Sequence, residues 1–187
     1  ESIQLKHAGL AKQAMAMTVW KADDGYDHIV SAQQDLLRAI LRLKLTDKLR
    51  EELGATYSPT AGNVASEIYP GFGYISASSE IEPQDVERVH AAIDEIAASM
   101  ASGGISEDEL QRARKPILEG MEEAEEDNGS WIGLIDEAQS LPGDLDRWRN
   151  DEAVYQAITV DELTRAAAKY FTPDNTLRLS IISDKVE

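Results

Sequence analysis

The chain has 187 residues, 42% of them hydrophobic and 28% charged, which is the composition of a globular domain with a sizeable core. Its formal net charge of −17 opposes contact with phosphate backbones and argues against nucleic acid as a partner. Cysteine is absent, which excludes disulfides, thiolate zinc ligands and cysteine nucleophiles. We expect no membrane span, because no apolar run approaches the roughly 20 residues that cross a bilayer.

The first half of the chain predicts a strand followed by a long helix. We interpret residues 1–10 as a lead-in segment to one domain over 11–187. The short apolar stretch 11–21 predicts a buried strand, which ends before the breaker at 23–25. Apolar residues then recur in steps of four and predict one helix over 28–53, with a stripe formed by Leu37, Leu41, Leu45, Leu49 and Leu53.

Two strands and an amphipathic helix are expected next. The strands cover 55–65 and 71–81, and the turn residues Pro70 and Gly71 between them favour an antiparallel pair. Pro83 opens a helix whose apolar stripe, spaced by three and four residues, consists of Val86, Val89, Ile93, Ile96 and Met100.

Two capping boxes mark helix starts in the second half of the chain. Ser106 has Glu109 three residues later, and Thr159 has Glu162, so each pair can satisfy backbone N–H groups at a helix start. The other expected elements are helices over 130–140 and 146–157 and a strand over 177–181. Neighbouring strands and segregated helices predict an α+β fold, an antiparallel sheet with helices packed on one face.

The residues alone indicate no metal site. The three histidines, His7, His28 and His90, are far apart, and neither H-E-x-x-H nor its inverse H-x-x-E-H occurs. Glu87 and His90 share one helical turn, a pattern that predicts a solvated helix face and not a zinc site. The acidic run from 122 to 127 lacks the alternating ligands and central glycine of a calcium loop, so we interpret it as a solvated helix end.

The most informative stretch joins the long helix to the following strand. Arg50 lies near the helix end, Gly54 is a natural stop, and Tyr57 follows at the predicted strand start. A guanidinium and a phenol presented together could hold a peptide backbone or stabilise an oxyanion. Considered by themselves, both residues also have an ordinary explanation. An arginine at a helix C-terminus offsets the dipole, and tyrosine is common in strands.

The segment Arg50-Glu51-Glu52-Leu53-Gly54-Ala55-Thr56-Tyr57-Ser58 resembles the Arg-(six residues)-Tyr signature of the pitrilysin/insulinase zinc peptidases. The resemblance extends upstream to the strand ending in Trp20. Downstream it includes the run 69–74 and the helix around 109–114, so that it covers nearly the whole chain. It implies a metallohydrolase half-domain of the mitochondrial processing peptidase/insulinase type.

The resemblance implies a catalytic site that is divided between two halves. Zinc would be held by an H-x-x-E-H motif in an N-terminal half or a partner subunit, and none would be bound by this chain. Arg50 would grip a main-chain carbonyl of a peptide or unfolded polypeptide, and Tyr57 would donate to the scissile carbonyl oxygen. We therefore expect a zinc metalloendopeptidase in which this chain alone is inactive.

Several alternatives stay open at this level. The chain could be a non-catalytic family member that serves as a partner subunit or scaffold. It could also be an acidic binding module for basic peptides, which a concentration of acidic residues on one face would favour. An exposed sheet edge could pair with a second copy. The resemblance favours a periplasmic location, with the cytoplasm as the alternative.

Overall fold

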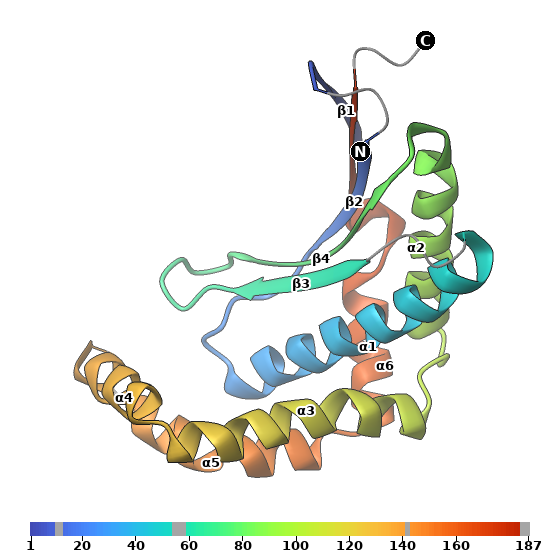
Figure 1. Cartoon of the computed structure of the whole chain (residues 1–187). Coiled ribbons are helices and arrows are strands. Elements are labelled where there is room, and N and C mark those ends of the chain that lie inside the picture. Colours follow the sequence, from blue (N-terminus) through green and yellow to red (C-terminus); the bar gives the residue numbers. More distant parts are fainter. Residues whose placement is uncertain (10–12, 54–58, 141–142, 184–187) are drawn as a thin grey trace.

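The computed structural model describes residues 1–9, 13–53, 59–140 and 143–183, and these form a sheet with helices on one side (Figure 1). The sheet has five strands in the order β1-β5-β2-β4-β3. The strands are β1 Ser2–His7, β2 Ala14–Lys21, β3 Thr60–Ala65, β4 Gly73–Ile81 and β5 Thr176–Ser183.

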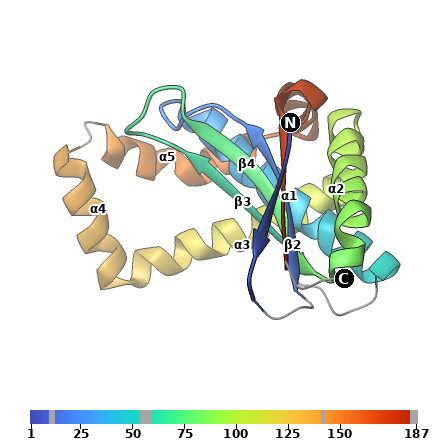
Figure 2. The ribbon, with the colours of Figure 1, turned by 90° about the horizontal axis from the view of Figure 1, so that it is seen from above.

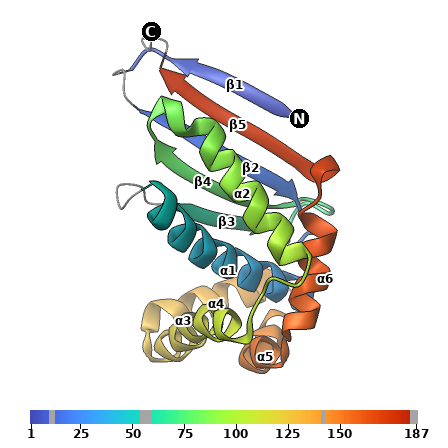
Figure 3. The same cartoon turned by 90° about the vertical axis from the view of Figure 1, so that its right-hand side faces the viewer.

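Six helices build two further layers. Helices α1, α2 and α6 lie over one face of the sheet, and α3 and α5 pack on the far side of α1 (Figure 3). The bounds are α1 His28–Leu53, α2 Val86–Ala101, α3 Glu107–Glu126, α4 Asn128–Ser140, α5 Asp144–Ala157 and α6 Val160–Tyr170. None of the helices in the described part of the chain combines the length and the apolar character needed to cross a bilayer. The predicted α+β class with helices on one face is confirmed.

The central strand β2 explains why the sheet has one covered face. Its residues alternate between fully buried and half-buried positions, as expected for period-two geometry. Ala16, Thr18 and Trp20 point to the helices, and the ring of Trp20 contacts Phe171 at the end of α6 with 4.7 Å between ring centroids. β2 pairs antiparallel with β4 and β5. β3 pairs antiparallel with β4, as the sequence predicts.

The edge strand β1 was not predicted. Residues 2–7 were interpreted as part of a lead-in segment, yet they pair in parallel with β5, from Ser2 opposite Arg178 to His7 opposite Ser183. The sheet is therefore mixed and not purely antiparallel. The alternation Ser2-Ile3-Gln4-Leu5 is a strand signal, but its partner lies about 175 residues away in sequence, beyond the reach of local patterns.

Helix α1 forms as predicted, with the same bounds. The Asp27 carboxylate caps its start by accepting from the backbone N–H groups of Ile29 and Val30, at 2.9 and 3.2 Å. Its apolar stripe is almost completely buried between the sheet and α3, at 0 or 1% exposure for Leu36, Leu37, Ile40, Leu41, Leu45 and Leu49. Both predicted capping boxes are confirmed, Ser106 with Glu109 and Thr159 with Glu162.

Some boundaries differ from the sequence prediction. Strand β3 begins at Thr60, and the predicted strand positions 55–58 lie outside the described residues. Helix α4 starts two residues earlier than expected, at Asn128, because the Asp127 carboxylate accepts from the Ser130 N–H at 2.7 Å and caps it.

The core of α1 provides a test of this packing. Leu41→Ala should lower the free energy of unfolding by about 2–5 kcal/mol, because it leaves a cavity at a position with no exposure. Ile29→Ala, at 52% exposure in the same helix, should change it by less than about 0.5 kcal/mol. Urea unfolding followed by circular dichroism measures both, and equal losses would contradict the packing described here.

Candidate functional site

Arg50 lies in the last turn of α1, where the packing of its neighbour determines its direction. Leu49 is 1% exposed in the core, and the next residue of a helix points about 100° away. Arg50 is accordingly exposed. It is the basic residue of the last α1 turn, so it also complements the negative end of the helix dipole. The structure thus presents the guanidinium to solvent, as a peptide clamp requires.

Tyr57 lies outside the described residues. The described chain resumes at Pro59, which is buried, and β3 starts at Thr60. The end of α1 and the start of β3 lie at the same end of the sheet (Figure 3). The pairing of Arg50 with Tyr57 in one site therefore stays a prediction.

The histidines do not form a metal centre in the described part of the chain, where no group of three or more His, Asp or Glu side chains is arranged to hold a metal. His28 contacts the Asp151 carboxylate, and His7 lies 3.3 Å from the Gln13 carbonyl oxygen. His90 lies between two hydroxyls. These residues do not fit a zinc site, and we derive no catalytic step through a metal held by this chain.

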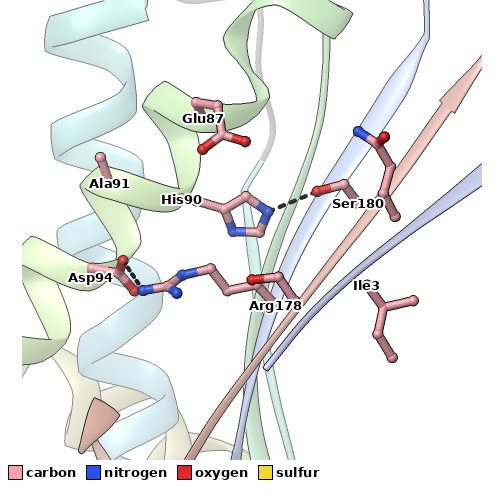
Figure 4. Close-up of a pocket in the computed structure, with 9 residues that line it drawn as sticks. Ile3, Glu87, His90, Ala91, Asp94, Arg178 and Ser180 are labelled. Carbon is pink, nitrogen blue, oxygen red and sulfur yellow. Dashed lines mark hydrogen bonds and ion pairs between the residues drawn. The ribbon is translucent and has the colours of Figure 1, made fainter.

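A polar cavity of about 400 Å³ opens between α2, β5 and β1 (Figure 4). His90 forms its inner wall. Its Nδ1 lies 3.2 Å from the Thr18 hydroxyl and its Nε2 lies 3.1 Å from the Ser180 hydroxyl. At the rim, Arg178 donates to the Asp94 carboxylate at 2.5 Å. Both ring nitrogens and the guanidinium already have protein partners, so this cluster is built to satisfy buried polar groups.

The prediction of a solvated face at Glu87 and His90 is half wrong. Glu87 is exposed, but His90 is only 5% exposed, because α2 turns this side toward the sheet. Burial lowers the pKa of His90. The charge of Arg178 lowers this pKa further, and the carboxylates of Glu87 and Asp94 partly oppose the shift. The imidazole is therefore neutral at pH 7. One polar residue in an apolar helical stripe was the only available signal of this burial.

Two tyrosines, away from the cavity beside α2, donate hydrogen bonds that hold helices α5 and α6 in place. Tyr170 donates to Asp23 at 2.6 Å and Tyr155 donates to Asp35 at 2.6 Å. Burial and the adjacent carboxylates raise the pKa of both phenols far above the usual value, so both remain donors. Burial raises the pKa of Asp23, but hydrogen bonds from Lys169 and Tyr170 outweigh this effect and keep it below its usual value. These contacts hold α6 and α5 in place and offer no reactive group.

The fold of the chain is shared with solved structures. A peptidase M16 inactive domain from Pseudomonas fluorescens superimposes with a TM-score of 0.77 over all of this chain and 44% of its own, at 18% identity. The periplasmic protease PqqL from Escherichia coli superimposes with a TM-score of 0.76 over 98% of this chain and 20% of its own, at 16% identity. At such identities the two superpositions show the fold alone. The fold is that of the helix-backed sheet units of M16 peptidases.

Residues 2–117 match the family described as peptidase M16 inactive domain, and the chain belongs to this family. The chloroplastic stromal processing peptidase of Pisum sativum is 27% identical over 146 residues, which are 76% of this chain and 12% of that protein. The chain thus spans about an eighth of this curated relative and less than half of the two solved structures described above. The resemblance to zinc peptidases of the pitrilysin/insulinase type is confirmed at the level of the family.

The buried imidazole makes stability depend on pH in a defined direction. Because the pKa of His90 is lower in the folded chain than in the unfolded chain, the unfolded state binds more protons just below about pH 6.5. The stabilisation is complete above this pH and is lost as the pH falls toward the lowered pKa. Urea unfolding between about pH 7.5 and 5 should show this loss as a slope of the unfolding free energy against pH. His90→Gln should remove the part of this slope that comes from His90.

His7→Gln controls for the removal of an imidazole outside the core and should retain the slope. A His90→Gln variant with the same pH dependence as the natural chain would show that His90 does not titrate as its burial demands.

Proposed function

We propose that this chain is the C-terminal region of a zinc-dependent metalloendopeptidase. In this proposal Arg50 and Tyr57 bind the peptide backbone and stabilise the oxyanion, while a zinc site on another domain performs hydrolysis. The observation that carries the proposal is the exposed guanidinium at the end of α1, in a chain of the peptidase M16 inactive-domain family. A partner-subunit role without catalysis is the alternative, and no described contact favours it.

The role of Arg50 rests on its chemistry and its position. A guanidinium offers several donors in a fixed plane, which suits the carbonyl oxygens of an extended peptide. The buried Leu49 determines the direction of the side chain, so little conformational freedom of the helix is lost on binding. Removal of such a charged donor costs about 1.5–3 kcal/mol of binding, or roughly 10- to 100-fold.

The role of Tyr57 rests on its chain distance from Arg50. Six residues separate the two, and the connection from α1 to β3 is short, so both side chains are expected at the same end of the sheet. A phenol donates one directional hydrogen bond. Placed against the scissile carbonyl oxygen, it would gain strength as negative charge develops there in the transition state.

Zinc would be supplied by an N-terminal half or a partner subunit, where it would activate the attacking water. Catalysis would then require closure of the two halves around the substrate, which couples turnover to a conformational change. Peptides or unfolded polypeptides are the expected substrates. We infer a periplasmic location, supported by the described location of PqqL, whose fold this chain shares.

The test uses the complete gene product that contains this sequence. Tyr57→Phe should lower kcat by about 10²-fold or more, the scale for removal of one oxyanion donor, with little change in KM. Arg50→Ala should lower kcat/KM by roughly 10- to 100-fold, and Arg50→Lys should restore only part of it, because an ammonium cannot reproduce the planar fork. Steady-state cleavage of a fluorogenic peptide measures all three.

Arg112→Ala is the matched control, because this exposed arginine on α3 lies in a weak surface pair with Asp108 at 3.8 Å. Its kinetics should equal those of the natural protein. Unchanged kcat in Tyr57→Phe together with unchanged kcat/KM in Arg50→Ala would remove the catalytic proposal and leave the partner-subunit alternative.

A further inference from the structure

A projecting arm made by the end of α3, helix α4 and the start of α5 carries most of the excess charge of the chain. We define the arm as residues 117–140 and 143–146. Six acidic residues lie between 119 and 127 and four between 136 and 146, and the arm has no lysine or arginine. It therefore holds ten of the 17 net negative charges. Figure 2 shows the arm reaching away from the sheet, with α4 at its far end.

The arm also exposes an apolar surface. Ile132 is 69% exposed and Ile135 57%, and they lie on one side of α4 because they are three residues apart. Trp131 on α4 is 39% exposed, and Leu145 at the start of α5 is 40% exposed. We call these four residues the arm patch. Isolated exposed apolar residues are common, but a group gathered on one projecting helix corner indicates an interaction surface.

Several acidic residues of the arm lie at the C-terminal end of a helix, where negative charge is unfavourable. Glu122, Glu123, Glu125 and Glu126 occupy the last turns of α3, next to the negative end of its dipole, and all four are exposed. No described lysine or arginine lies within ion-pair distance of these four carboxylates. Such a charge arrangement disfavours the free helix and is relieved by any cation brought beside it.

The corner of the arm is held in a defined shape. Trp131 packs edge-on against Trp148 of α5, with 4.9 Å between ring centroids, and its indole N–H donates to the Glu125 carbonyl oxygen at 2.8 Å. This bond satisfies a free carbonyl at the end of α3. Arg147, just beyond the arm, contacts the Glu67 carboxylate at the tip of the β3–β4 hairpin. The patch is thus preorganised, which reduces the entropy cost of binding.

We propose that the arm is a docking site for a cationic amphipathic peptide segment, whose apolar side would cover the arm patch while its lysines and arginines approach the carboxylates at the end of α3. The surface is apart from Arg50 and independent of the catalytic proposal. Charge complementarity selects this occupant. A second copy of the chain, at −17, would be repelled. Nucleic acids and anionic membranes are repelled for the same reason.

The experiment measures binding of a fluorescently labelled helical peptide of about 18 leucines and lysines to the chain by anisotropy, with intrinsic tryptophan emission as a second signal. The natural chain should bind, its emission should shift to the blue as Trp131 loses water, and the affinity should fall at least tenfold between about 50 and 500 mM salt. A peptide with glutamate in place of lysine should not bind.

Two multiple variants separate the two contributions. I132S/I135S should weaken binding at least tenfold. E122Q/E123Q/E125Q/E126Q should weaken it to a similar extent and flatten the salt dependence. Their matched controls should bind like the natural chain. I68S/Y69S removes two exposed apolar side chains at the β3–β4 tip, and E1Q/E80Q/E82Q/D174N removes four exposed carboxylates away from the arm. Circular dichroism verifies that each variant is folded.

Three outcomes would overturn the proposal. The first is binding of the glutamate peptide as tight as that of the lysine peptide, which would show that apolar contact alone determines the affinity. The second is equal loss in the arm variants and their controls, which would show binding to net charge anywhere on the surface. The third is a concentration-dependent dimer in sedimentation that I132S/I135S abolishes, with no peptide binding, which would assign the patch to a second copy of the chain.

Discussion

The burial of the leucine stripe of α1 is the constraint from which the other features follow. This helix contacts β3 and β4 on one side and α3, α5 and α6 on others, so its apolar residues belong to every layer of the molecule. Leu36, Leu41 and Leu45 are at most 1% exposed. Rotation of the helix by one residue would expose this stripe and bury charged residues, which costs several kcal/mol. The exposed position of Arg50 is a direct consequence of that phase.

The interface between α2 and the sheet contains a cluster of buried polar side chains that the apolar stripe of α2 did not predict. His90 is accommodated because Thr18 and Ser180, on adjacent strands, place their hydroxyls at its two ring nitrogens. A buried imidazole without such partners would destabilise the fold. Arg114 is a less complete case. It is 8% exposed and contacts the Ile158 carbonyl oxygen, but its Nε has no hydrogen-bond partner in the described structure.

Charge is distributed unevenly between the body of the domain and its arm. The sheet with α1, α2 and α6 mixes both signs in many pairs, such as Lys48 with Glu95 and Arg178 with Asp94. Such exposed pairs contribute little to stability individually. The arm, in contrast, carries one sign only, beside apolar side chains. Two features of different character thus exist in one small domain, the exposed Arg50 at the end of α1 and an acidic arm with exposed apolar side chains.

Features that depend on neighbouring residues were predictable from the sequence. The bounds of α1 follow from its four-residue repeat, and both capping boxes follow from a serine or threonine with glutamate three residues later. The family resemblance was readable from the order of motifs around Arg50, and it is confirmed. The α+β class follows from the same local signals, since each depends on contacts within a few residues.

What only the tertiary structure decided depends on contacts between distant segments. The pairing of β1 with β5 joins the two ends of the described chain, and no local pattern specifies that partner. The burial of His90 depends on hydroxyls 72 and 90 residues away, so its helical turn alone suggested solvent. The sequence by itself determined the elements and their apolar faces. Because strand partners and buried polar contacts form only when those faces pack together, the tertiary structure alone decided the mixed sheet, the neutral imidazole and the projection of the acidic arm.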